Sequence, residues 1–118
     1  MSGRILVAED EALIAMQLEA DLQDAGHEVV GPCLSLGACM DMLDGAPIDA
    51  AVLDVDLGGA DVFPVAKVLS ERGVPFVFHT GSAAHDKILA RFPDSRIFTK
   101  PTDVRFMLAR LGLYGVTG

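Results

Sequence analysis

Short apolar runs alternate along the chain with segments whose apolar residues recur at helical spacing. Each run is short enough for one β-strand, and the runs cover residues 5–8, 28–31, 49–54, 76–80 and 96–99. After the first run, Ile14, Leu18 and Leu22 recur every four residues, as on one face of a helix, and Gly26 is a plausible stop. The pattern predicts five strands, each followed by a helix.

The predicted sheet is parallel. The third run is apolar throughout rather than alternating, which is typical of a strand buried on both faces. Repeated strand–helix units imply right-handed crossovers and helices on both faces. We therefore predict a three-layer α/β sandwich of five such units. We expect Ser35, Asp61 and Thr102 to cap three helices, and a weakly marked fourth helix over residues 86–91.

Composition narrows the function classes. The 118 residues suit one domain, and 9 basic against 17 acidic residues give a net charge of −8, which opposes non-specific binding to DNA or anionic membranes. No apolar stretch approaches the roughly 18 residues that span a bilayer, and residues 1–4 lead directly into a strand. We expect a cytoplasmic protein without membrane insertion or direct nucleic-acid contact. Cys33 and Cys39 are predicted to be buried free thiols.

Four of the predicted strands end on chemically active side chains. Glu9 and Asp10 follow the first, Asp54 ends the third, Thr80 ends the fourth, and Lys100 follows the fifth. In an open parallel sheet, ligands bind at the carboxyl ends of the strands. We therefore expect three acids, a hydroxyl and a lysine to meet at one edge of the sheet.

This combination suits magnesium-assisted phosphoryl transfer. Clustered carboxylates repel one another unless a cation neutralises them, and Mg²⁺ prefers oxygen ligands. A carboxylate can act as a nucleophile and form an aspartyl phosphate. Lys100 would supply a second positive charge, and Thr80 could donate a hydrogen bond to a phosphoryl oxygen.

These residues, together with Pro101, resemble those of response-regulator receiver domains, the CheY-like superfamily, from Arg4 to about Leu111. The resemblance implies a flavodoxin-like strand order of 2-1-3-4-5. It also implies that Asp54 accepts a phosphoryl group from a histidine kinase or a histidine phosphotransfer protein, with intrinsic autophosphorylation and autodephosphorylation. Asp10, Asp54 and the backbone carbonyl of Asp56 would bind Mg²⁺, with Glu9 acting through water. The peptide between Lys100 and Pro101 would be cis.

The chain departs from the common receiver pattern at several positions. Ile97 stands where many relatives carry an aromatic switch residue, and Gly58 and Gly59 replace a proline-bearing loop. The resemblance assigns tuning of acyl-phosphate hydrolysis to Asp56 and Ser82. Residues 78–81 at the end of the fourth strand resemble the Phe-x-Thr-Gly motif that ends the fourth strand in one branch of the receiver domains. These features predict a mobile fourth helix and a switch that orders this segment.

Two other functions remain open from the sequence. One is a receiver-like interaction module that binds partners without phosphorylation. The other is a small phosphatase of the haloacid-dehalogenase type, suggested by Asp54 and Asp56, although Gly58 stands where that motif wants Thr or Val. His79, beside Thr80, is predicted to have a surface or packing role. We expect residues 1–118 to form a single receiver domain with no output domain, whose downstream partner the sequence does not identify.

Overall fold

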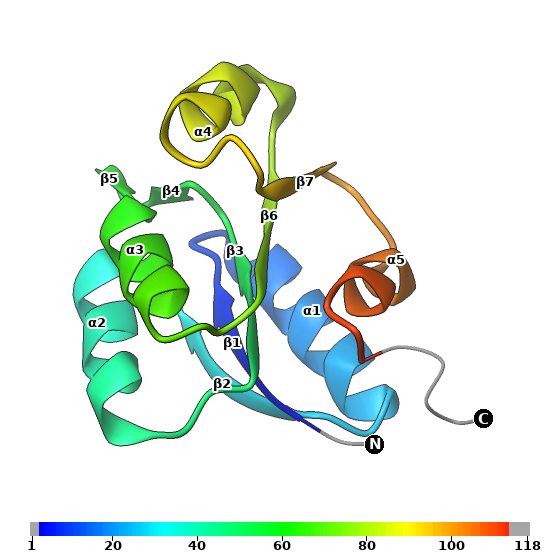
Figure 1. Ribbon diagram of the computed structural model, residues 1–118. Helices are drawn as coiled ribbons and strands as arrows, with labels where there is room; N and C mark the ends of the chain where they lie inside the picture. Colours follow the sequence, from blue (N-terminus) through cyan, green and yellow to red (C-terminus); the bar gives the residue numbers. More distant parts are fainter. Residues whose placement is uncertain (1–2, 114–118) are drawn as a thin grey trace.

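The computed structural model describes residues 3–113, and a parallel five-stranded sheet lies at its centre (Figure 1). The strands of this sheet are β1 (Arg4–Ala8), β2 (Glu28–Cys33), β3 (Ala50–Leu53), β6 (Phe76–Thr80) and β7 (Arg96–Thr99). Their order across the sheet is β2-β1-β3-β6-β7. Counted within this sheet alone, that is the predicted order 2-1-3-4-5, so the α/β fold prediction is confirmed.

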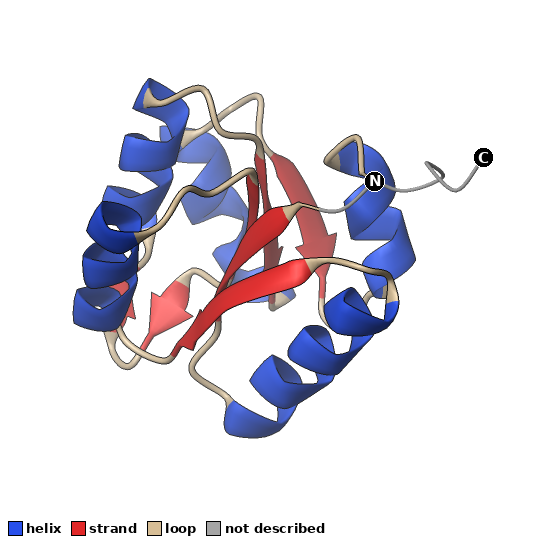
Figure 2. Cartoon of the chain, turned by 90° about the horizontal axis from the view of Figure 1, so that it is seen from below, coloured by secondary structure: helices blue, strands red, loops and turns tan. Residues whose placement is uncertain are grey.

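Helices cover both faces of the sheet and form the outer layers (Figures 1 and 2). One face carries α1 (Ala12–Asp24) and α5 (Val104–Arg110), and the other carries α2 (Leu36–Gly45) and α3 (Phe63–Glu71). A short 3₁₀ turn, η1 (Ser82–Ala84), leads from β6 into α4 (His85–Arg91), close to the predicted fourth helix. Two apolar cores result, and Ile88 of α4 joins the one beneath α2 and α3.

Side-chain hydrogen bonds at the starts of α2 and α5 test two of the three predicted helix caps. The Ser35 hydroxyl accepts a hydrogen bond from a first-turn amide of α2 at 3.2 Å, as predicted. The prediction for Thr102 is wrong, because its hydroxyl donates to the Thr99 carbonyl at 2.6 Å and closes a turn instead. The neighbouring Asp103 caps α5, accepting from a first-turn amide at 2.9 Å.

A small antiparallel hairpin follows β3 and was not predicted. It consists of β4 (Asp56–Leu57) and β5 (Ala60–Asp61). Gly58 and Gly59 form its turn with φ of 60° and 88°, and positive φ at both central positions is the geometry of a type I′ turn. The prediction that Asp61 caps α3 is wrong: Asp61 belongs to β5, and Val62 precedes the helix without a side-chain cap.

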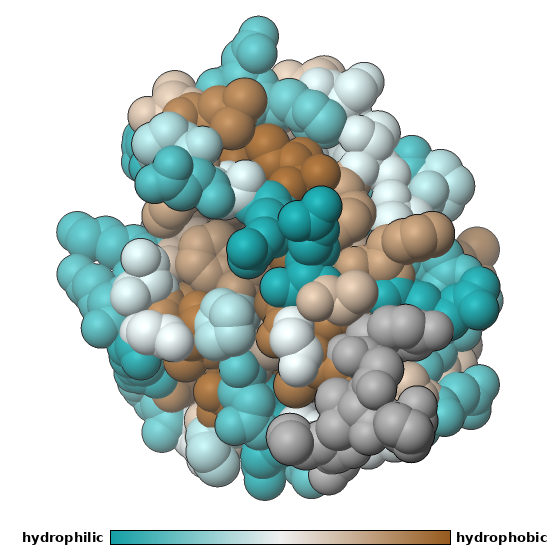
Figure 3. All heavy atoms as spheres, turned by 45° about the vertical axis from the view of Figure 1, so that its right-hand side comes forward, coloured by the Kyte–Doolittle hydropathy of each residue, from teal (hydrophilic) through white to brown (hydrophobic). Residues whose placement is uncertain are grey.

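The two cysteines are buried in the interior, and the surface mixes hydrophilic and hydrophobic residues (Figure 3). Cys33 and Cys39 are buried free thiols, as predicted. A hydrogen bond to Cys33, together with burial, raises the pKa of the Cys39 thiol, so it is a neutral core group. Figure 3 shows hydrophobic residues exposed between hydrophilic ones on one face, as on most folded proteins. Within residues 3–113, no helix has the length and apolar character needed to cross a bilayer.

Candidate functional site

The carboxyl ends of β1, β3, β6 and β7 bring together the acids, hydroxyl and lysine that the sequence analysis singled out. Asp54 lies directly after β3 and is only 6% exposed. Its backbone amide donates to the Ala8 carbonyl at 2.8 Å, which holds it beside the end of β1. Parallel pairing thus carries residues distant in sequence to one edge of the sheet.

Both oxygens of the Asp54 carboxylate accept short hydrogen bonds. The Thr80 hydroxyl donates to Oδ1 at 2.8 Å, and the Lys100 ammonium donates to Oδ2 at 2.7 Å. The Asp56 amide lies 3.4 Å from Oδ1. The carboxylate is therefore held in one orientation by a neutral donor on one oxygen and a cation on the other.

Lys100 is the counter-charge of the cluster. Its ammonium lies 2.7 Å from Asp54 Oδ2, 2.8 Å from Glu9 Oε1 and 3.9 Å from Glu11 Oε2. Burial alone would lower the Lys100 pKa, but the hydrogen bonds to Asp54 and Glu9 outweigh it and the pKa is raised. Lys100 therefore stays charged. The peptide between Lys100 and Pro101 is cis, as the resemblance implied.

Glu9, Asp10 and Asp54 are placed to hold a metal ion. Each offers one carboxylate oxygen, and these atoms lie within 4.8 Å of one another. Burial raises the pKa of Glu9 to about 7, although the hydrogen bond from Lys100 opposes the rise. When all three acids are ionised, the single ammonium leaves two uncompensated negative charges. A donor set of oxygens with this charge fits one hard divalent cation such as Mg²⁺.

The hairpin contributes contacts that the sequence analysis missed. The Gly58 amide donates to Asp10 Oδ2 at 3.1 Å, and the Gly59 amide donates to Asp56 Oδ1 at 3.1 Å. The Asp56 carboxylate is thus engaged within the hairpin, outside the three-acid cluster. Two consecutive glycines were the available signal for this turn. Metal binding by the Asp56 carbonyl stays a prediction.

The predicted switch and tuning residues lie around this edge without joining the cluster. Ser82 is exposed at the start of η1. Ile97 is partly buried against the core beneath α2 and α3, whereas Phe98 packs against the core beneath α1 and α5. His79 is 4% exposed, so of its two predicted roles the structure selects packing. The tuning role of Ser82 and the switch roles of the Ile97 and Pro101 positions stay predictions.

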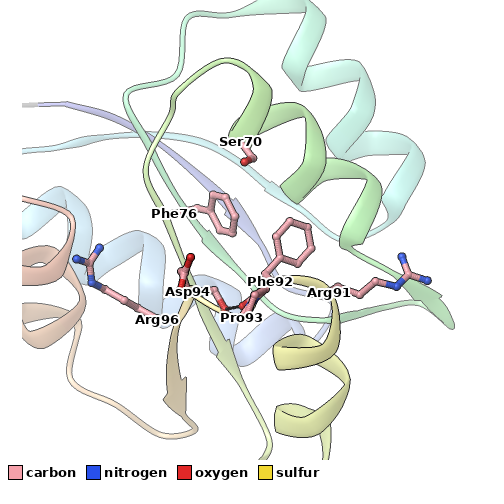
Figure 4. A pocket seen from close by; sticks show the side chains of 8 residues that line it. Ser70, Phe76, Arg91, Phe92, Pro93, Asp94 and Arg96 are labelled. Atoms are coloured by element: carbon pink, nitrogen blue, oxygen red, sulfur yellow. Dashed lines mark hydrogen bonds between the residues drawn. The ribbon is translucent and has the colours of Figure 1, made fainter.

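A separate cavity lies at the other end of the sheet (Figure 4). It has a volume of about 310 Å³, and its lining includes Phe76 and Arg96, the first residues of β6 and β7. The carboxylates of Glu9, Asp10 and Asp54 follow the opposite, carboxyl ends of the strands. This cavity is therefore separate from the chemistry described above.

Comparison with known proteins finds one curated protein and several solved structures that are similar to this chain. No family model matches the chain. A transcriptional regulatory protein, PdtaR of Mycobacterium tuberculosis, is 31% identical over 86 residues, which is 72% of this chain and 42% of that protein. The match thus spans less than half of the length of this curated relative.

Solved structures match over nearly the whole chain. SdrG from Sphingomonas melonis is 40% identical with a TM-score of 0.80, covering 92% of this chain and 95% of that one. The BeF₃-activated conformation of SdrG from Pseudomonas melonis is 39% identical with a TM-score of 0.75, covering 92% of this chain and 94% of that one. A response regulator receiver protein from Sinorhizobium medicae is 32% identical with a TM-score of 0.80, covering 99% and 98%. With this fold and these relatives, the chain belongs to the receiver domains of response regulators.

Proposed function

We propose that this receiver domain accepts a phosphoryl group on Asp54, with Mg²⁺, from the phosphohistidine of a histidine kinase or a histidine phosphotransfer protein. The observation that carries the proposal is the Asp54 carboxylate, held between the Thr80 hydroxyl and the Lys100 ammonium at 2.8 and 2.7 Å. Glu9 and Asp10 stand beside it with oxygens within 4.8 Å. Phosphorylation would then change the surface that binds a downstream partner.

The proposed transfer is a displacement at phosphorus. One oxygen of Asp54 forms the new P–O bond as the P–N bond to the donor histidine breaks, and the electron pair of that bond returns to the imidazole. Mg²⁺, held by Glu9, Asp10 and Asp54, would supply charge neutralisation for the phosphoryl oxygens. Thr80 and Lys100 already donate to the Asp54 oxygens. Both are therefore in place to donate to phosphoryl oxygens after transfer.

A donor protein needs a surface beside the site, and α1 offers one. Leu13 and Met16 are 82% and 63% exposed on this helix. A groove of about 230 Å³ runs between α1 and the loop after β7, and its lining includes Leu13, Lys100 and Pro101. Exposed apolar side chains bordering a polar site are a common feature of protein-binding surfaces. We infer that the donor docks across this groove.

The proposed conformational response to phosphorylation involves α4. The Lys87 ammonium pairs with Asp61 of the hairpin at 2.7 Å, and His85 Nε2 lies 3.1 Å from the Thr99 hydroxyl. The helix is two turns long, and Ile88 is its buried residue, while Phe92 at its C-terminal end packs against the aromatic rings of the core. With Ile97 in place of an aromatic switch, the proposed response is ordering of the segment between Thr80 and Lys100. Amide exchange there that is unchanged by BeF₃⁻ and Mg²⁺ would contradict this response.

The central test is covalent modification. Acetyl phosphate with Mg²⁺ should add one phosphoryl group to the wild-type protein, measured by intact mass. Asp54→Asn should abolish the addition, and Asp44→Asn is the matched control, because Asp44 lies in the last turn of α2 with its side chain 87% exposed, away from the cluster. The relative solved in a BeF₃-activated conformation supports the choice of this chemistry.

The same experiment separates the alternatives. A wild-type protein that takes up no phosphoryl group would instead fit an interaction module that works without phosphorylation. Multiple turnover of a generic phosphomonoester would revive the phosphatase, whose paired acids would both have to face the substrate. The Asp56 carboxylate bonds the hairpin instead. A single domain over residues 1–118 and a cytoplasmic location stay predictions.

A further inference from the structure

The loop that carries Lys100 is held by two adjacent residues of β6. The Thr80 carbonyl accepts from the Lys100 amide at 2.9 Å. His79 Nε2 accepts from the Thr102 amide at 3.3 Å. Neighbouring side chains of a strand point to opposite faces, so the Thr80 hydroxyl reaches Asp54 while the His79 ring reaches the loop on the other side.

The Thr102 amide is the first backbone donor after Lys100, because Pro101 has no N–H. Its bond to His79 is partly buried, since the His79 ring is 4% exposed and Thr102 is half-buried. The same ring lines the groove beside α1 together with Lys100, Pro101 and Thr102. His79 is therefore in contact with the segment whose position sets where the Lys100 ammonium lies.

A packing role alone does not account for an imidazole at this position. Because Nε2 accepts from the Thr102 amide, Nδ1 carries the hydrogen, and within the described part of the chain this buried Nδ1 has no hydrogen-bond partner. A buried polar atom without a partner is unfavourable, so an apolar side chain would serve packing better. Burial and the Lys100 charge lower the pKa of His79, which keeps the ring neutral and able to accept.

We propose that His79 is a positioning residue, which holds the loop of residues 100–102 so that the Lys100 ammonium stays against Asp54. The distances of 3.3 Å to Thr102 and 2.7 Å from Lys100 to Asp54 define the two ends of this connection. Its consequence for phosphoryl transfer rests on the function proposed above. The positioning itself is a property of the metal-free, unphosphorylated protein.

The test compares two substitutions of similar size. His79→Leu removes the acceptor, whereas His79→Gln keeps an acceptor at the end of a side chain of similar reach; His79→Met replaces the leucine variant if that one does not fold. Three quantities are measured: the rate of modification by acetyl phosphate at saturating Mg²⁺, the Kd for Mg²⁺, and the hydrogen-exchange rate of the Thr102 amide without metal.

Loss of one such hydrogen bond should slow modification about fivefold in His79→Leu. Exchange at Thr102 should accelerate, while the Kd for Mg²⁺ changes by less than about twofold, because no metal ligand is touched. His79→Gln should restore both the rate and the protection. Wild-type rates and Thr102 protection in His79→Leu would overturn the proposal. So would equal loss of rate and Mg²⁺ affinity in both variants, which signals general core damage.

If even the wild-type protein is not modified, the proposed function fails. Exchange at Thr102 then decides the positioning role alone. Faster exchange in His79→Leu, restored in His79→Gln, would still support it, and unchanged exchange would refute it.

Discussion

Replacing Lys100 with methionine should destabilise the metal-free protein far more than the same change at Lys87. Both ammonium groups lie 2.7 Å from a carboxylate oxygen, Lys100 from Asp54 and Lys87 from Asp61. The pairs differ in burial: the side chains are 17% and 8% exposed in the first pair, and 53% and 46% exposed in the second. The comparison therefore sets a buried ammonium that pairs with both Asp54 and Glu9 against an exposed ammonium that pairs with Asp61.

Removing one partner of a buried ion pair leaves the other charge unpaired, which costs about 3 kcal/mol. In Lys100→Met the remaining charges are the carboxylates of Glu9, Asp10 and Asp54. Protonation of Glu9, whose pKa is already raised to about 7, limits the loss. An exposed pair contributes at most about 1 kcal/mol, so Lys87→Met should lie near wild type.

Urea unfolding at pH 8, in EDTA and again in Mg²⁺, measures both parts of this prediction. Mg²⁺ should stabilise Lys100→Met more than wild type, because the ion no longer competes with an ammonium; binding should tighten by about tenfold. Equal losses in the two lysine variants would refute the burial argument. A smaller Mg²⁺ stabilisation in Lys100→Met than in wild type would refute the charge argument.

Two further predictions concern the fold away from the acids. His27 is buried, and its Nδ1 accepts a hydrogen bond from the Gly3 amide at 3.0 Å. Burial lowers the pKa of His27, so the folded state binds fewer protons than the unfolded state. The free energy of unfolding that neutral His27 contributes is therefore lost as the pH falls below about 6.5, the pKa of an unperturbed histidine. His27→Asn, which keeps an acceptor, should lose less free energy of unfolding between pH 7 and 5, and parallel pH curves would contradict this. Gly31→Ala should cost about 3 kcal/mol, because at φ of 101° its Cβ would lie 2.7 Å from the Cys33 nitrogen. Gly26→Ala, with φ of 90° but open space, should cost only about 1 kcal/mol in the same denaturation assay.

The sequence predicts the sheet well because its strands are buried on both faces. Continuous apolar runs such as residues 50–53 mark such strands, and parallel pairing then fixes where their ends meet. That is why the sequence alone predicts that Asp54, Thr80 and Lys100 lie together. Their separation in sequence is large, but each directly follows or ends a strand of the same sheet.

The features that were missed depend on local geometry with weak sequence signals. The two-residue strands β4 and β5 are too short to show alternation, so only Gly58 and Gly59 marked the hairpin. Thr102 and Asp103 are both good cap residues, and the choice between them follows from the turn that the Thr102 hydroxyl closes with Thr99. The bond from Thr102 to His79 depends on the path of the same loop.

The hairpin also limits which chain lengths this segment can tolerate. Its turn is two residues long. The Gly58 amide ties this turn to Asp10, while Asp61 at the end of β5 is tied to α4 through Lys87. An inserted or deleted residue would reverse the inward and outward sides of a strand and shift one of these ties out of reach. The stretch that follows Asp54 is thus a spacer of fixed length, in which side chains can be exchanged more freely than residues can be added or removed.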